Sequence, residues 1–134
     1  MKEEPTKTEL KDYLKFIKSF SRYHGGDLLR KIHDELWYKT FPAYQEKEKW
    51  ELIHPAVLIS CRKQGNCVDK SFALADICDS YGLKTKFPVA TSIESNPFKH
   101  MWVRFYTKKS YVDLDPTISN YVLLIREDPS LISL

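Results

Sequence analysis

Residues 63–81, KQGNCVDKSFALADICDSY, decide how the rest of the chain is interpreted. A Gly-Asn-Cys turn precedes a run of apolar residues at helical spacing, which predicts a helix that begins at Cys67 and ends at Gly82. Asn66 is placed to cap this helix, and Asp69 falls at its third position, where the helix dipole favours a carboxylate. Cys67 therefore lies among backbone N–H groups that no carbonyl of the helix can pair.

The position of Cys67 suits a nucleophile. The surrounding N–H groups and the dipole stabilise a thiolate, which is the form that attacks a carbonyl carbon. A cysteine taken alone is more often a small core residue. Two later residues favour the nucleophile: His100 opens the strand-like run HMWVRFY, and Asp115 closes the run YVDLD. Their order along the chain gives the parts of a thiol, imidazole and carboxylate triad.

Three motifs resemble the transglutaminase-like superfamily of papain-like thiol enzymes. That family has a Gly-x-Cys helix, a His-x-Trp strand and a strand that ends in Asp-Pro-Thr; this chain has GNC at 65–67, HMW at 100–102 and DPT at 115–117. The separations of 33 and 15 residues between Cys67, His100 and Asp115 suit a compact core. Upstream, WELIHP at 50–55 is similar to the Trp-x-x-Pro segment of some prokaryotic members, with two residues more between the tryptophan and the proline. The resemblance covers about half of the chain.

Helical spacing before residue 63 and strand-like alternation after residue 85 predict an α+β fold. One helix is expected from Thr6 to a stop near 24–26, a second after Asp27 as N-cap, and a short third one begins at Pro55. The first helix is expected to face the core with Leu10, Tyr13, Leu14, Ile17 and Phe20. Antiparallel strands are expected at 86–91, 100–106, 111–114 and 121–125. The resemblance implies that the Cys67 helix packs on this small sheet as a papain-like core.

The helix that begins at Cys67 is apolar almost all round, which indicates that other elements enclose it. We expect four of its residues to face solvent: Asp69, Lys70, Asp76 and Asp79. Gly65, just before the helix, is expected to have a positive φ or to bring its backbone close to the substrate.

Composition limits the classes of protein that fit. With 134 residues we expect one domain over 1–134, with 1–5 frayed and the catalytic core at about 50–125. The net charge is +3, and the lysines and arginines are spread along the chain, which argues against nucleic-acid binding. No apolar run approaches the ~18 residues of a membrane span, and the N-terminus lacks an apolar signal region. We therefore expect no membrane association and a cytoplasmic protein.

The cysteines and the remaining histidines give no sign of a metal. Cys61, Cys67 and Cys78 match neither a disulfide framework nor a zinc pattern, so we expect reduced thiols, no metal and no cofactor. His54 is the alternative imidazole, because it lies close in sequence to the Cys67 helix. His33, like His24, is expected to be structural or solvated.

The expected chemistry is acyl transfer through a thioester. Cys67 would attack an amide carbonyl, His100 would deliver a proton to the leaving amine, and Asp115 would orient the imidazole. The resemblance favours Asp115 because the family's carboxylate precedes Pro-Thr, although Asp113 points to the same side of a strand. Water would resolve the thioester by hydrolysis and a lysine amine by cross-linking, and the triad is compatible with both.

The oxyanion of the tetrahedral intermediate needs hydrogen-bond donors. The backbone N–H of Cys67 is one candidate. The side chain of Gln64 is a second, as a glutamine serves in papain-like enzymes. Trp102 is expected either beside the imidazole, where it shields the site from water, or packed in the sheet.

Two function classes fit the sequence. The first is an enzyme, a thiol-dependent amide hydrolase of the cysteine peptidase kind or a transglutaminase-like acyl transferase, that acts on a peptide or protein substrate. The alternative is a catalytically silent module of the same fold that binds a peptide or protein.

Overall fold

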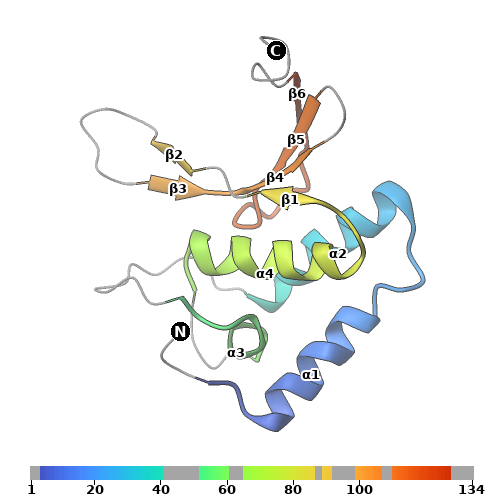
Figure 1. Ribbon diagram of the computed structural model, residues 1–134, viewed down its shortest axis with the longest axis vertical. Coiled ribbons are helices and arrows are strands. Elements are labelled where there is room, and N and C mark those ends of the chain that lie inside the picture. Colours follow the sequence, from blue (N-terminus) through green and yellow to red (C-terminus); the bar gives the residue numbers. More distant parts are fainter. Residues whose placement is uncertain are drawn as a thin grey trace.

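Four helices precede the strands in this computed structural model, which describes residues 4–40, 52–60, 65–86, 89–91, 99–106 and 110–127 (Figure 1). The helices within these ranges are α1 (Lys7–Lys18), α2 (Gly25–Lys39), α3 (Pro55–Ile59) and α4 (Cys67–Ser80). The strands are β1 (Thr85–Lys86), β2 (Val89–Thr91), β3 (Lys99–Met101), β4 (Val103–Tyr106), β5 (Ser110–Leu114) and β6 (Leu124–Glu127). The expected α+β class is confirmed.

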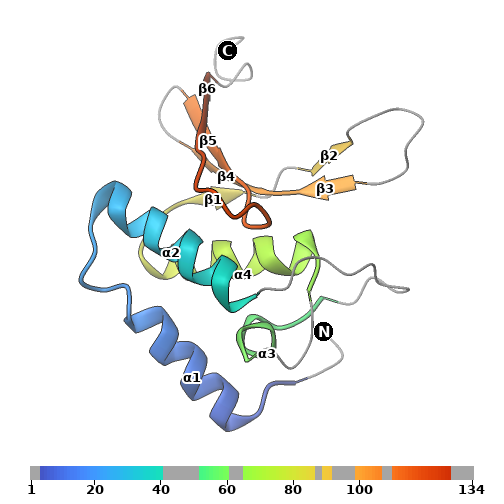
Figure 2. The same ribbon diagram turned by 180° about the vertical axis from the view of Figure 1, so that it is seen from behind.

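The strands lie on one side of the molecule and the helices on the other. Figures 1 and 2 show α4 directly against the sheet, with α3 and α1 on the side of α4 that faces away from the strands. The strand order is β1-β4-β5-β6, and β2 pairs with β3 in a separate antiparallel ladder. Thr85 pairs with Phe105 and Val89 with Met101, so the two ladders share one register. The β2–β3 pair therefore has the same register as the β1–β4 pair, and Trp102 lies between β3 and β4.

Helix α1 begins as expected but turns a different face inward. The Thr6 and Glu9 capping box is present. Tyr13 and Phe20 join the core, whereas Leu10 and Leu14 are exposed, which corrects the predicted inward face. Polar contacts select this face, because Glu9 accepts a hydrogen bond from Ser60 after α3, and the hydroxyl of Tyr13 donates to Asp76 of α4.

Two predicted helix ends are wrong. The first helix ends at Lys18 rather than near residues 24–26, although backbone hydrogen bonds continue through the turn as far as Tyr23. The second begins at Gly25, two residues before the expected cap Asp27, with His24 as the N-cap residue. Leu28, Ile32 and Leu36 of α2 are buried in the core.

The strand predicted at 121–125 begins three residues late. β6 starts at Leu124, where Leu124 pairs with Asp113 of β5. Tyr121 and Leu123 instead pack against the hydrophobic core, so the chain joins the sheet only after it has covered this part of the core. The strand predicted at 86–91 is described as β1 and β2, with residues 87–88 between them outside the described ranges.

The glycine before α4 is required by packing. A Cβ at Gly65 would lie 2.6 Å from Leu58 Cδ1 and 2.9 Å from Asp69 Cβ. Of the two alternatives expected for Gly65, a positive φ is wrong, since the described glycines with a positive φ are Gly25 and Gly82, and a close approach to a substrate stays a prediction. The backbone at Gly65 instead passes between α3 and α4, where no side chain fits.

Replacing Gly65 with alanine should lower the free energy of unfolding by about 1–3 kcal/mol, because the added methyl group overlaps two buried neighbours. Urea unfolding followed by tryptophan fluorescence measures the change. Gly26→Ala is the matched control, since nothing lies within 4 Å of a Cβ at that position in the first turn of α2. An unchanged unfolding midpoint for Gly65→Ala would contradict this packing.

Candidate active site

The start of α4 has the predicted cap. The Asn66 side-chain oxygen accepts hydrogen bonds from the backbone N–H groups of Val68, at 3.0 Å, and Asp69, at 3.2 Å. The Asp69 carboxylate in turn accepts the N–H of Asn66 at 2.9 Å, which completes a capping box. Cys67 is therefore the first residue of the helix, and only 2% of it is exposed.

Asp69 also joins α4 to the segment before α3. Its Oδ1 accepts the backbone N–H of Ile53 at 2.9 Å, and its side chain is fully buried. The predicted exposure of Asp69 is therefore wrong, whereas Asp76 and Asp79 are exposed as expected. A buried carboxylate is stable only where hydrogen bonds replace water, and here backbone N–H groups supply them.

Lys70 is the second residue of α4 whose predicted exposure is wrong. It is 1% exposed. Burial lowers the pKa of Lys70, while the nearby charges of Asp115, Asp69 and Cys67 act to raise it. Sequence reasoning missed this residue, although its position one helical turn after Cys67 was a signal that the two side chains are neighbours.

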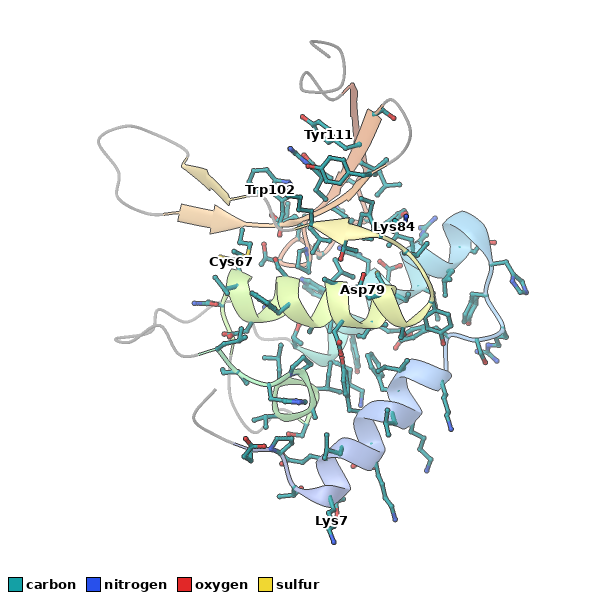
Figure 3. All side chains as sticks on the ribbon, viewed as in Figure 1. Lys7, Cys67, Asp79, Lys84, Trp102 and Tyr111 are labelled. Atoms are coloured by element: carbon teal, nitrogen blue, oxygen red, sulfur yellow. The ribbon has the colours of Figure 1, made fainter. Side chains whose placement is uncertain are left out.

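The first turns of α4 lie against β3. Ser71, four residues after Cys67, donates a hydrogen bond to the carbonyl of Met101 at 3.2 Å. Figure 3 shows Cys67 at the end of α4 that lies beside β3, with Trp102 across from it at the break between β3 and β4. Residues i and i+4 share one face of a helix, so Cys67 and Ser71 both face this strand.

His100 lies in β3, where its backbone pairs with Ala90. The structure describes the backbone of His100 and not its side chain. Because the next residue, Met101, accepts the hydrogen bond from Ser71, the strand that carries His100 crosses the start of α4. The predicted contact between the His100 imidazole and the Cys67 thiol stays a prediction.

Asp115 directly follows β5 and forms a turn with Thr117. Its Oδ1 accepts the Thr117 backbone N–H at 2.9 Å and the Thr117 hydroxyl at 2.6 Å. The carbonyl of Asp115 lies 3.3 Å from Nε2 of His33, a fully buried residue of α2. This contact with α2 places the turn on the helical side of the sheet.

Asp113, the alternative carboxylate, lies in a different environment. Arg104 on the neighbouring strand donates to both of its oxygens, at 2.8 and 3.0 Å. The guanidinium also lies over the ring of Tyr111, 3.6 Å from the centroid. Next to Asp113, Leu114 is part of the core, and alternate residues of a strand point to opposite faces. Asp113 therefore faces away from the helices and from Cys67.

The other predicted residues have structural roles or lie outside the described ranges. Nδ1 of His54 accepts the N–H of Ala56 at 3.0 Å, so this histidine caps α3. Cys78 is buried, and burial raises the pKa of its thiol. Trp102 is half-buried at the break between β3 and β4. Gln64, Cys61, Trp50 and the N-terminal residues 1–3, on which part of the predicted fraying falls, lie outside the described residues.

Two findings concern the part of the chain that the structure describes. Within it, no three side chains of His, Cys, Asp or Glu lie close enough together to hold a metal ion. No helix there has the length and apolar character needed to cross a membrane. Comparison with protein-family models, with curated proteins and with solved structures finds no match for this chain.

Asp69→Asn should lower the free energy of unfolding by about 2–3 kcal/mol, because an amide NH₂ would oppose one of two buried N–H donors. Urea unfolding measures the effect. Asp12→Asn, on the exposed side of α1, is the matched control and should change stability by less than about 0.5 kcal/mol. Equal stability of the two variants would show that the Ile53 and Asn66 bonds do not fix the start of α4.

Proposed function

We propose that this chain is a thiol-dependent enzyme with a papain-like, transglutaminase-type core, which acts on amides of peptides or proteins through Cys67, His100 and Asp115. One observation carries the proposal. Ser71, in the second turn of the helix that begins at Cys67, donates a hydrogen bond to Met101, the neighbour of His100. The turn at Asp115 contacts α2 on the same side of the sheet, which is compatible with a common site.

In the proposed reaction, the Cys67 thiolate attacks the amide carbonyl carbon and forms a tetrahedral intermediate. The protonated imidazole of His100 donates its proton to the leaving nitrogen, the C–N bond breaks, and an acyl thioester remains on Cys67. Water then attacks the thioester to give a carboxylic acid, or an amine attacks to give a new amide. His100 accepts the proton of the attacking group, and the thiolate leaves.

Asp115 is the proposed carboxylate of the triad. A carboxylate accepts several hydrogen bonds, so the turn with Thr117 is compatible with a further bond from the imidazole. Asp113 is less suitable, because Arg104 contacts both of its oxygens on the far side of the sheet.

The proposed oxyanion donor is the backbone N–H of Cys67. Asn66 caps the next two N–H groups of the helix, those of Val68 and Asp69, so all three groups lie at the same helix end. The position of the Cys67 N–H at the positive end of the dipole favours a developing negative charge.

A catalytically silent module of the same fold that binds a peptide or protein is the second candidate. The burial of Cys67 favours it, since a thiol that is 2% exposed meets a substrate only if the site opens. The turn-forming role of the Asp115 carboxylate also favours it.

Iodoacetamide labelling between pH 5 and 9, read for each cysteine by mass spectrometry, separates the two candidates. The enzyme predicts that Cys67 reacts well below the pH of an ordinary thiol, ~8.5, and that His100→Ala removes most of this advantage. Cys78 in the same chain is the internal control, because its burial should keep it slow throughout. If Cys67 labels as slowly as Cys78 at every pH, the binding module is the better interpretation.

Substituting the two carboxylates should distinguish their roles. Asp115→Asn is expected to slow the burst of p-nitrophenolate from p-nitrophenyl acetate roughly 100-fold, because the imidazole loses the group that orients it. Asp113→Asn removes a charged partner of Arg104 and should lower stability while the burst rate stays within about threefold of the unsubstituted chain. Urea unfolding supplies the stability readout. A larger burst defect in Asp113→Asn would reverse the assignment.

A further inference from the structure

Lys70 is a fully buried lysine beside the candidate nucleophile. Its side chain is 1% exposed, although lysine is almost never buried without a charged partner. Transfer of an ammonium group out of water is costly, so such a lysine persists only where nearby negative charge compensates it. The residues around Lys70 therefore indicate the role of its charge.

Three acidic groups of the described residues interact with Lys70. Burial lowers the pKa of Lys70, and these three groups act to raise it, Asp115 most, followed by Asp69 and Cys67. The oxygens of Asp69 accept the N–H groups of Ile53 and Asn66, so this carboxylate has a structural task at the cap. Asp115 and Cys67 are the two groups that the proposed reaction uses.

Helix geometry places Lys70 and Cys67 together independently of any charge. Residues three apart on a helix have Cβ atoms about 5–6 Å from each other. The side chain of a lysine is long enough to bring its ammonium group close to a thiol at that spacing. Because Cys67 is itself 2% exposed, water screens the interaction weakly.

We propose that Lys70 is a positioning residue of the site, whose buried ammonium holds the Asp115 carboxylate at the start of α4 and favours the thiolate form of Cys67. This inference rests on the proposed function above. It gives the thiolate a second cation besides His100.

A purely structural lysine makes a different prediction. If Lys70 only compensates Asp69 at the cap, its removal changes stability and leaves the labelling of Cys67 unaffected. If it acts on Cys67, its removal changes the pH profile of the thiol whatever happens to stability. The measurement must therefore report both quantities.

The test compares the full chain with Lys70→Met, which keeps an unbranched side chain one atom shorter and removes its charge. Iodoacetamide labelling of Cys67 at pH 7 should fall about tenfold, and the midpoint of its pH profile should rise by about one unit. Lys70→Arg should retain more of the rate than Lys70→Met. The same loss should appear at 1 M salt, because a buried charge is screened little.

Lys84→Met is the matched control. Lys84 is exposed and lies beyond the other end of α4 from Cys67, as Figure 3 shows. Its substitution should leave the profile of Cys67 unchanged. A Lys70→Met profile within twofold of the unsubstituted chain overturns the proposal.

Thermal unfolding checks that each variant folds, and Lys70→Gln is the second variant should Lys70→Met be unfolded. Removal of one partner of a buried charge pair is destabilising, so both variants should unfold at a lower temperature, and labelling is compared at a temperature where each is folded. If both variants are unfolded, Lys70 is a structural residue and the proposal fails.

His100→Ala and the double variant His100→Ala/Lys70→Met separate this inference from the proposed function. If His100→Ala slows labelling of Cys67 and Lys70→Met does not, the enzyme proposal is supported and the proposed role of Lys70 is wrong. If Lys70→Met slows labelling in both backgrounds and His100→Ala has no effect, the role of Lys70 is supported and the triad is wrong. If neither substitution changes the labelling rate of Cys67, both proposals are wrong.

Discussion

The buried carboxylate of Asp69 is the interaction on which the described structure around Cys67 depends. It accepts one backbone N–H from the segment before α3 and another from the residue that caps α4. A charge without water must keep both bonds, so the two segments are fixed relative to each other. The close approach at Gly65 follows from this, because the chain between α3 and α4 has no room for a side chain. Cys67 takes its position from these contacts.

The turn at Asp115 is the second point where distant segments meet. It joins the sheet to α2 through the contact of its carbonyl with His33, whose other ring nitrogen lies 2.9 Å from the Asp34 carboxylate. His33 also packs its ring against Tyr121, 5.5 Å away between centroids. Side chains of α2, α4 and the segment after β5 thus surround one turn. A group held from so many sides moves little, which is the preorganisation that acid–base chemistry requires.

Two carboxylates two residues apart have separate tasks because the strand ends between them. While the chain is in β5, Asp113 points away from the helices and pairs with Arg104 on β4. After Leu114 the chain leaves the sheet, so alternation no longer governs Asp115, whose carboxylate forms a turn with Thr117. One carboxylate stabilises the outer face of the sheet, and the other stabilises the turn that contacts α2.

The sequence by itself determined the features that depend on neighbours within one helical turn or on regular alternation. The Thr6 and Asn66 caps, the order of helices and strands and the α+β class are of this kind, because local hydrogen bonds and apolar periodicity specify them. Only the tertiary structure decided the burial of Asp69 and Lys70, the exposure of Leu14 and the late start of β6. Each of these depends on a partner far along the chain, such as Ile53 for Asp69 and Asp115 for Lys70. Periodicity assigns a residue to a face by its polarity, and it contains no information on a distant group that compensates a buried charge.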